Sequence, residues 1–288
     1  MSLAKYEVFL TVVELGSLTK AGEALQLTQS AVSYSISNLE MELGFPLLIR
    51  TRTGVSLTEN GERILIYIRK ILHWEEKMRQ EAATINGLAV GTIRIGAFTS
   101  ICTSWLPLLI KEFKQDYPSI EIKILQGGYQ DIEEWIIRGE VDFGFVSLPT
   151  QDVFKTIPIK IDPLICIFSK NHPFNKQQKV RLEQLENEPF IVQKSGYDND
   201  IRRIVKETKC TFNIAFEMAD DQAIIAMVEN NLGVSIIPTL VLQNSPRHVS
   251  FSPLEPAQFR MIAIGAISLK ELSPAAKEFI EYLKKMVI

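Results

Sequence analysis

The segment from residue 17 to residue 39 reads as two short helices joined by a tight turn. In the second helix Val32, Ile36, Leu39 and Leu43 recur at steps of four and three, which places them on one buried stripe. The opposite side carries amides, a phenol and several serines. Because serine is a poor residue for a helix interior, helix propensity does not explain this polar face. It fits the major groove of DNA, where amides pair with base edges and hydroxyls reach bases or phosphates.

The surrounding segments complete a winged helix-turn-helix over residues 1–58. Residues 4–15 read as a first helix, and residues 47–50 and 55–57 read as a small β-hairpin, the wing. The residues expected to contact DNA are Thr28, Gln29, Ser30, Ser33, Tyr34, Ser37, Asn38, Arg50 and Arg52.

The charge of this segment argues weakly against DNA binding. Residues 1–58 hold four basic and five acidic side chains, a net charge of −1, whereas a nucleic-acid binder is expected to be basic. Glu40 and Glu42, however, follow the groove-facing part of the second helix. With so few cations, one domain should bind DNA weakly, so two or more copies are needed.

A long helix is predicted over residues 59–87, opened by Thr58. Apolar residues recur in it at steps of four and three, interrupted once by Glu75, which is typical of a coiled-coil seam. The residues of this expected dimerisation seam are Ile64, Ile68, Ile71, Met78, Ala82 and Ile85. The alternative is a helix that packs only on its own domain.

From Gly91 onward, predicted strands and helices alternate, which implies parallel sheets with helices on both faces. The predicted strands are 92–97, 120–125, 141–146, 164–168, 190–192, 213–216, 234–237 and 259–267. The predicted helices are 105–116, 130–138, a short one after Arg181, 198–208, 221–231 and 274–286. The two series suggest two lobes, residues 91–161 with 265–288 and residues 162–264. The chain would cross between them near 160–163 and 263–267, which makes a hinge and a cleft.

Phrases along the whole chain resemble the LysR-type transcriptional regulators. They are Phe9–Ala21, Leu27–Ser33, Leu57–Gly61, Gly91–Gly96, Trp105–Pro107, Tyr117–Pro118, Gly139–Gly144, His172–Pro173 and Leu232–Pro238. The resemblance implies a winged helix-turn-helix, a dimerising linker helix and a two-lobed α/β effector domain like that of periplasmic solute-binding proteins. It further implies a homotetramer made of two linker-helix dimers. The chain departs from the family at Leu48, at Thr53 and at Gly22, which replaces a common alanine and should cost helix stability of about 1 kcal/mol.

The expected effector site lies where the first two strands of the α/β part end. Hydroxyl residues follow the first strand and glycines follow the second, so a carboxylate or another small anion could approach the backbone. The candidates are Thr99, Ser100, Gln126, Gly128 and Tyr129, with Gln193, Lys194, Ser195 and Asp220 from the second lobe. Ser100 and Tyr129 stand where the resembling family lines its effector cleft. The alternatives are helix capping by Thr103 or Ser104 and a plain turn at the glycines.

Other classes of function find little support in the sequence. There is no transmembrane run, no secretory pattern, no nucleophile elbow, no phosphate-binding glycine loop and no metal-like histidine spacing. Cys102, Cys166 and Cys210 are expected to be reduced thiols in a cytoplasmic protein. A transported-solute receptor would not explain residues 1–86. The expected partners are promoter DNA, a small-molecule effector, a second copy of the chain and the transcription machinery, without an enzyme activity, cofactor or membrane. A regulator that acts through protein contacts alone stays an alternative.

Overall fold

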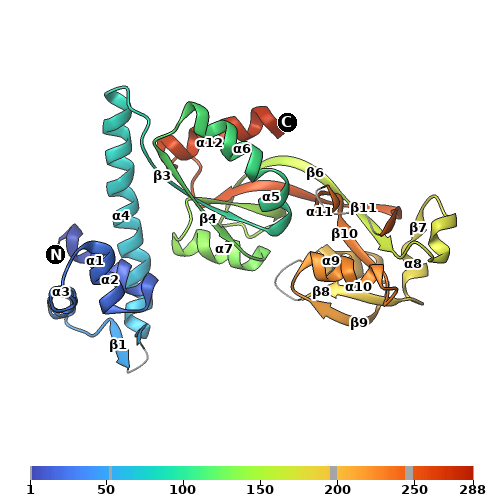
Figure 1. The fold of residues 1–288 in the computed structure, drawn as a ribbon, viewed down its shortest axis with the longest axis horizontal. Helices are drawn as coiled ribbons and strands as arrows, with labels where there is room; N and C mark the ends of the chain where they lie inside the picture. Colours follow the sequence, from blue (N-terminus) through green and yellow to red (C-terminus); the bar gives the residue numbers. More distant parts are fainter. Residues whose placement is uncertain (1, 52–53, 195–199, 244–248, 288) are drawn as a thin grey trace. The chain divides into compact units, whose positions relative to one another are not determined.

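A computed structural model describes residues 2–51, 54–194, 200–243 and 249–287 of the chain. The chain forms two compact units, Met1–Gly87 and Leu88–Ile288 (Figure 1). Among the described helices, none combines the length and the hydropathy that a membrane span requires.

The first unit is the predicted winged helix-turn-helix with the long helix after it. Its elements are α1 (Leu3–Leu15), α2 (Leu18–Leu25), α3 (Gln29–Leu43), β1 (Leu48–Thr51), β2 (Gly54–Leu57) and α4 (Glu59–Ile85). Three of the helices begin at a hydroxyl cap: Ser17 Oγ accepts a hydrogen bond from Lys20 N, Thr28 Oγ1 from Ala31 N, and Thr58 Oγ1 from Gly61 N. The antiparallel hairpin pairs Leu48 with Leu57.

The predicted apolar stripe of α3 is confirmed. Val32, Ile36 and Leu39 are fully buried and pack with Phe9 and other residues of α1. One face of the helix is therefore fixed in the core, and the other face is left for solvent or a ligand.

Gly22 has a different role from the predicted one. It is buried, and a Cβ at this position would lie 2.7 Å from the carbonyl oxygen of Leu27. Alanine would therefore clash with backbone in the turn that leads to α3. The glycine permits the close approach of α2 to that turn, so the expected loss of stability relative to alanine is wrong.

Helix α4 corrects part of the predicted dimerisation seam. Ile68 is only 2% exposed and Ile64 is half-buried, and both pack into the core of their own unit. They are unavailable as seam residues, since the first turns of α4 close the helix-turn-helix core. The exposed apolar residues of α4 are Tyr67, Ile71, Trp74, Met78, Ala82 and Ile85. They recur at steps of four and three, so the exposed stripe keeps Ile71, Met78, Ala82 and Ile85 of the predicted seam and adds Tyr67 and Trp74.

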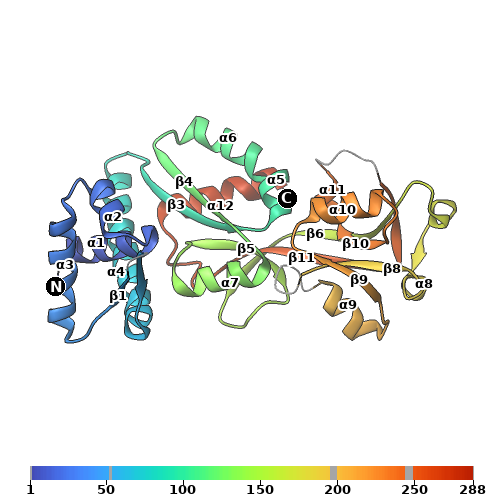
Figure 2. The ribbon, with the colours of Figure 1, turned by 60° about the horizontal axis from the view of Figure 1, so that its bottom comes forward.

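The first lobe of the second unit is a parallel sheet between helices. Strand β3 (Gly91–Ala97) lies between β4 (Ile120–Gln126) and β5 (Phe143–Leu148) and pairs in parallel with both. Its helices are α5 (Thr99–Ser104), α6 (Leu106–Asp116), α7 (Tyr129–Arg138) and α12 (Pro274–Val287). Helices α6 and α12 cover one face and α7 the other (Figures 1 and 2). The short helix α5 was not predicted.

Two long strands run through both lobes, and this corrects the predicted pair of separate parallel sheets. Strands β6 (Lys155–Phe168) and β11 (Ser250–Ala266) pair antiparallel along most of their length. Within a sheet of order β10-β6-β11-β5-β3-β4, three pairings are antiparallel. Prolines and charged residues between 156 and 163 interrupt the apolar pattern, so only the end of β6 was predicted from the sequence.

The second crossing between the lobes is also displaced. Residues 259–262 pair with 160–163, and residues 261–265 also pair with β5 of the first lobe. Strand β11 has therefore reached the first lobe by Met261, before the predicted crossing at 263–267.

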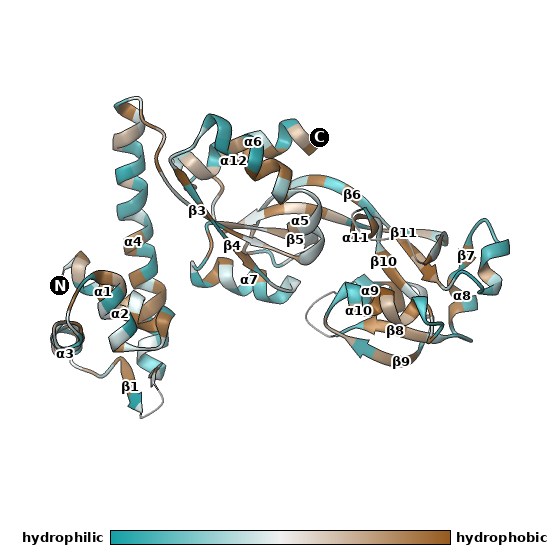
Figure 3. Cartoon of the chain, in the orientation of Figure 1, coloured by the Kyte–Doolittle hydropathy of each residue, from teal (hydrophilic) through white to brown (hydrophobic). Residues whose placement is uncertain are grey.

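The second lobe has its own core. Its strands are β7 (Val180–Arg181), β8 (Pro189–Gln193), β9 (Asn213–Met218) and β10 (Ser235–Pro238), and its helices are a short 3-10 turn (Pro173–Lys176), α8 (Leu182–Leu185), α9 (Asp200–Thr208), α10 (Asp221–Glu229) and α11 (Thr239–Leu242). Strands β8 and β9 are parallel, and β10 is antiparallel to β6. Hydrophobic residues concentrate on the strands and hydrophilic ones on the outer sides of the helices (Figure 3). Separate apolar clusters fill the two lobes, so a polar zone can lie between them.

Candidate functional site

The outward face of α3 is polar and open. Gln29, Ser30 and Ser37 are exposed, and Tyr34 exposes 71% of its surface. Asn38 is half-buried further along the helix. Thr28 serves mainly as the cap of α3, and its hydroxyl also bonds Ser30 Oγ at 3.0 Å.

The wing contributes a cation to this face. Arg50 of β1 donates from Nη1 to Ser33 Oγ at 2.8 Å and from Nη2 to Ser37 Oγ at 3.5 Å. The structure thus brings three predicted residues from two elements together. Arg50 remains exposed. Arg52, the other predicted arginine, lies outside the described residues.

The acidic residues that weakened the sequence argument are engaged within the unit. Glu40 Oε1 accepts hydrogen bonds from Leu47 N at 2.8 Å and Leu48 N at 3.1 Å, which fixes the turn before the wing. Glu42 pairs with Lys5 Nζ at 2.6 Å, and this contact lowers the pKa of Glu42. Donors within the unit partly compensate the charges of these two carboxylates. They should therefore repel a DNA phosphate less than the net charge suggests.

Between the two lobes lies a buried arginine that the sequence did not single out. Arg260 of β11 is 3% exposed and donates from Nε and Nη2 to Asp162 Oδ2. It also donates from Nη1 to Tyr129 OH at 2.7 Å and from Nη2 to Ser100 Oγ at 2.8 Å. Burial opposes the charged form, but Tyr129, Asp162 and Asp200 hold the pKa of Arg260 above its ordinary value. The guanidinium therefore stays a cation in the cleft.

The network continues into the second lobe. Tyr129 OH donates to Asp200 Oδ2 at 3.1 Å, and Asp200 is paired with Arg203 Nη2 at 3.4 Å. Arg203 also donates to the carbonyl oxygen of Phe259 at the crossing. Side chains of α7, β11 and α9 are thus linked across the cleft.

Most of the predicted residues of the first lobe line a small hollow. Its lining residues are Phe98, Thr99, Ser100, Gly127, Gly128, Tyr129, Gln193, Asp221, Pro238 and Arg260. Gln126 donates from Nε2 to Thr99 Oγ1 at 3.1 Å and so steadies one wall. The free volume is about 20 Å³, enough for about one water molecule. The lobes are therefore nearly closed on each other.

The predicted residues of the second lobe lie differently. Lys194 is exposed and does not line the hollow, so the expected cation of the site is Arg260 instead. Asp220 is exposed and caps α10 by accepting from Gln222 N, while its neighbour Asp221 faces the hollow. Ser195 lies outside the described residues.

The predicted alternative of helix capping is not what the hydroxyls do. Ser104 Oγ donates to the carbonyl oxygen of Leu240 at 3.1 Å, and Thr103 Oγ1 donates to the carbonyl oxygen of Thr99. Helix α6 begins at Leu106, and its N-cap residue Trp105 makes no side-chain capping hydrogen bond. The hydroxyls do not form the site alone, since Arg260 and Asp221 also line the hollow.

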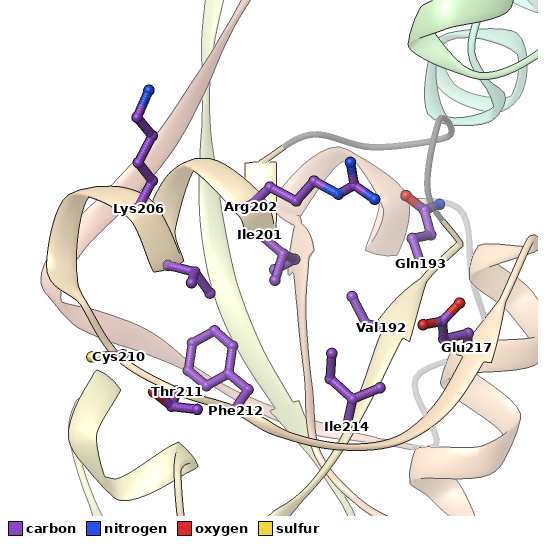
Figure 4. A pocket seen from close by; sticks show the side chains of 11 residues that line it. Val192, Gln193, Ile201, Arg202, Lys206, Cys210, Thr211, Phe212, Ile214 and Glu217 are labelled. Atoms are coloured by element: carbon purple, nitrogen blue, oxygen red, sulfur yellow. The ribbon is translucent and has the colours of Figure 1, made fainter.

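A larger apolar pocket of about 410 Å³ lies within the second lobe, between α9 and the strands β8 and β9 (Figure 4). Ile201, Phe212 and Ile214 form its interior, while Lys206 points away from it (Figure 4). The polar ends of Gln193, Arg202 and Glu217 lie on one side of it, while the interior is apolar (Figure 4).

Cys102 is held as a thiol. Burial raises its pKa to about 11, and Sγ lies 3.7 Å from the carbonyl oxygen of Ala97. Burial also raises the pKa of Cys166. Because the thiolate is the reactive form, both residues act as packing groups at neutral pH.

Two family models match the chain. One described as "Bacterial regulatory helix-turn-helix protein, lysR family" covers residues 3–62, and one described as "LysR substrate binding domain" covers residues 86–287. The uncharacterized HTH-type transcriptional regulator YvbU of Bacillus subtilis is 36% identical over 289 residues, 99% of each chain.

Solved structures share the fold over the whole chain. A full-length OxyR variant from Pseudomonas aeruginosa has a TM-score of 0.80 at 25% identity, covering 100% of this chain and 94% of that one. Full-length CbnR in a complex with its target DNA has a TM-score of 0.69 at 20% identity, covering 99% of both chains. The chain has a helix-turn-helix at one end and a two-lobed effector-binding domain at the other, and its relatives are regulators rather than enzymes. This chain therefore belongs to the LysR family of DNA-binding transcriptional regulators.

Proposed function

We propose that this regulator reads promoter DNA with α3 and Arg50 and senses a small metabolite in the cleft around Arg260. The observation that carries the first part is the exposed polar face of α3, where the wing arginine lies beside two serines. Amides and hydroxyls on such a helix can contact base edges, while the arginine is placed for a phosphate.

The cleft supports a ligand that carries an anionic group. Arg260 supplies a permanent cation, and Ser100 and Thr99 supply hydroxyls on the same wall. Because the hollow is nearly closed, a ligand must change the separation of the lobes when it binds. A difference in affinity between two arrangements, equivalent to about 1–3 kcal/mol, would be enough to couple the ligand to DNA binding.

The remaining parts of the function concern assembly. Residues 1–58 would bind DNA, residues 59–87 would join two chains, and the two lobes within residues 91–288 would bind the effector. Pairs of such dimers would form a tetramer on two neighbouring promoter sites and contact the transcription machinery. Since promoter DNA is its target, the protein would work in the cytoplasm.

The test is binding of the purified protein to the DNA upstream of its own gene, with an excess of random DNA as competitor. Specific retention at about 150 mM salt supports the proposal, because nonspecific phosphate contacts weaken steeply with salt. Equal loss of both DNAs would contradict a role at its own promoter. Repeating the assay with metabolites then tests the sensing function.

A further inference from the structure

Asp221 is a buried carboxylate without a counter-charge in the described part of the chain. It lies at the start of α10, exposes 7% of its surface, and accepts one hydrogen bond from Gln193 Nε2 at 2.6 Å. Asp162 is paired with Arg260 and Asp200 with Arg203, but no described cation lies within ion-pair distance of Asp221. It nevertheless lines the same hollow as Arg260.

The balance of charge in this hollow is therefore negative. The one positive charge of Arg260 is already matched by Asp162, which leaves Asp221 in excess. A buried charge is costly unless it is paired, and burial raises the pKa of Asp221 to about 6 although Arg260 acts in the opposite direction. A ligand with only negative charge would add to this excess, whereas a ligand with a cationic group would remove it.

The hollow also keeps a place for an anionic group. The described residues accept four hydrogen bonds from the guanidinium of Arg260, which has five N–H groups. Thr99 adds a hydroxyl on the same wall. The donors of Arg260 and Thr99 and the carboxylate of Asp221 thus line one small space. The three residues come from three different elements.

We propose that the effector is a small zwitterion of the amino-acid class, with its ammonium group on Asp221 and its carboxylate on Arg260 and Thr99. This inference rests on the proposed sensing function of the cleft and specifies its ligand. The ammonium group supplies the missing counter-charge, and the carboxylate takes the remaining N–H of Arg260. Because the free space holds about one water molecule, an amino acid enters only when the lobes move apart, so its binding favours a more open arrangement.

The experiment compares ligands that differ only in the ammonium group. The melting temperature of the full-length protein is measured with each of the twenty common amino acids, and with 2-hydroxy acids such as lactate, malate and 2-hydroxyglutarate as counterparts of alanine, aspartate and glutamate. At least one amino acid should raise the melting temperature by mass action, and its 2-hydroxy counterpart should not.

Two variants separate the role of Asp221 from the general charge of the lobe. Asp221→Asn keeps the shape of the side chain and the oxygen that accepts from Gln193. It should raise the dissociation constant of the amino acid at least tenfold. Asp220→Asn removes the same charge one residue away, on an exposed side chain whose capping role asparagine can fill, and should leave the affinity unchanged.

Three results would overturn the inference: no stabilisation by any amino acid, equal stabilisation by the 2-hydroxy acid, or unchanged affinity in Asp221→Asn. Specific promoter binding by the same preparation shows whether the regulator itself is intact. If a 2-hydroxy acid binds and alters that DNA binding, the sensing function stands and only the zwitterion is wrong.

Discussion

Arg260 donates two hydrogen bonds to a single oxygen of Asp162, from Nε at 3.0 Å and from Nη2 at 2.7 Å. The two residues are register partners on β11 and β6, at the point where these strands pass between the lobes. Asp162 Oδ1 also accepts from Leu240 N at 3.1 Å, so α11 is attached to the same pair. A buried ion pair therefore sits at the centre of the second unit, with both lobes attached to it.

Removal of Arg260 should destabilise the second unit strongly. Arg260→Met leaves Asp162 buried without a partner, which we expect to lower the free energy of unfolding by about 3–5 kcal/mol. The double variant Arg260→Met with Asp162→Asn should recover part of this loss, since residue 162 then carries no unpaired charge. Scanning calorimetry of the full chain measures both. Lys206→Met, an exposed cation on α9, is the control and should change stability by less than about 0.5 kcal/mol.

Asp221 should make the stability of the second unit depend on pH in a defined direction. Burial raises its pKa from the ordinary 3.8 to about 6, so the folded chain binds the proton more tightly than the unfolded chain. The free energy of unfolding then falls as pH rises from about 4 to about 6, by about 3 kcal/mol from this group.

The comparison of Asp221→Asn with the parent isolates this contribution. The variant should be the more stable protein at pH 7.5, and its advantage should shrink as pH falls toward 4. Arg260 lowers the pKa of Asp221 and Asp220 raises it, and both residues are present in the parent and in the variant. A stability difference that does not vary with pH would contradict the raised pKa.

The sequence predicted the elements whose pattern is local. The stripe of α3, the hydroxyl caps and the hairpin follow from spacing and turn chemistry within a few residues. The pairing of β6 with β11 was not predictable in this way, because Arg260 and Asp162 are 98 residues apart and each interrupts an apolar strand pattern. An arginine within a strand that is otherwise apolar was the available signal.

The same limit explains why the start of the predicted seam of α4 is wrong. The steps of four and three do not tell which residues of an apolar stripe pack on their own domain. Ile64 and Ile68 satisfy the pattern but are taken by their own unit.

Self-association should show whether the exposed stripe of α4 joins two chains. Ile71→Glu on the exposed stripe should leave the helix-turn-helix folded and reduce the mass in solution to that of a smaller assembly, because a charge is then placed in an apolar interface. Ile68→Glu should instead unfold the first unit, because the side chain is 2% exposed within its core. Analytical ultracentrifugation and circular dichroism together separate these results. An unchanged mass for Ile71→Glu would exclude this stripe as the contact.

DNA recognition should depend on the first turns of α3 more than on its end. Tyr34 is 71% exposed and makes no contact that holds the core, so Tyr34→Ala should weaken specific promoter binding by about 1–3 kcal/mol and leave the melting temperature unchanged. Ser33→Ala should weaken specific binding as well, since it releases Arg50 from its 2.8 Å hydrogen bond.

Met41 offers the matched control for Tyr34. It is 73% exposed and lies two turns further along the same face of α3, beyond the residues that enter the groove. Met41→Ala should bind the promoter like the parent in a filter or polarisation assay with random DNA as competitor. If Met41→Ala were the damaging variant and Tyr34→Ala were not, the helix would lie on DNA by its carboxyl end. The contacts expected for Gln29, Ser30 and Arg50 would then be wrong, although α3 would still be the DNA-binding helix.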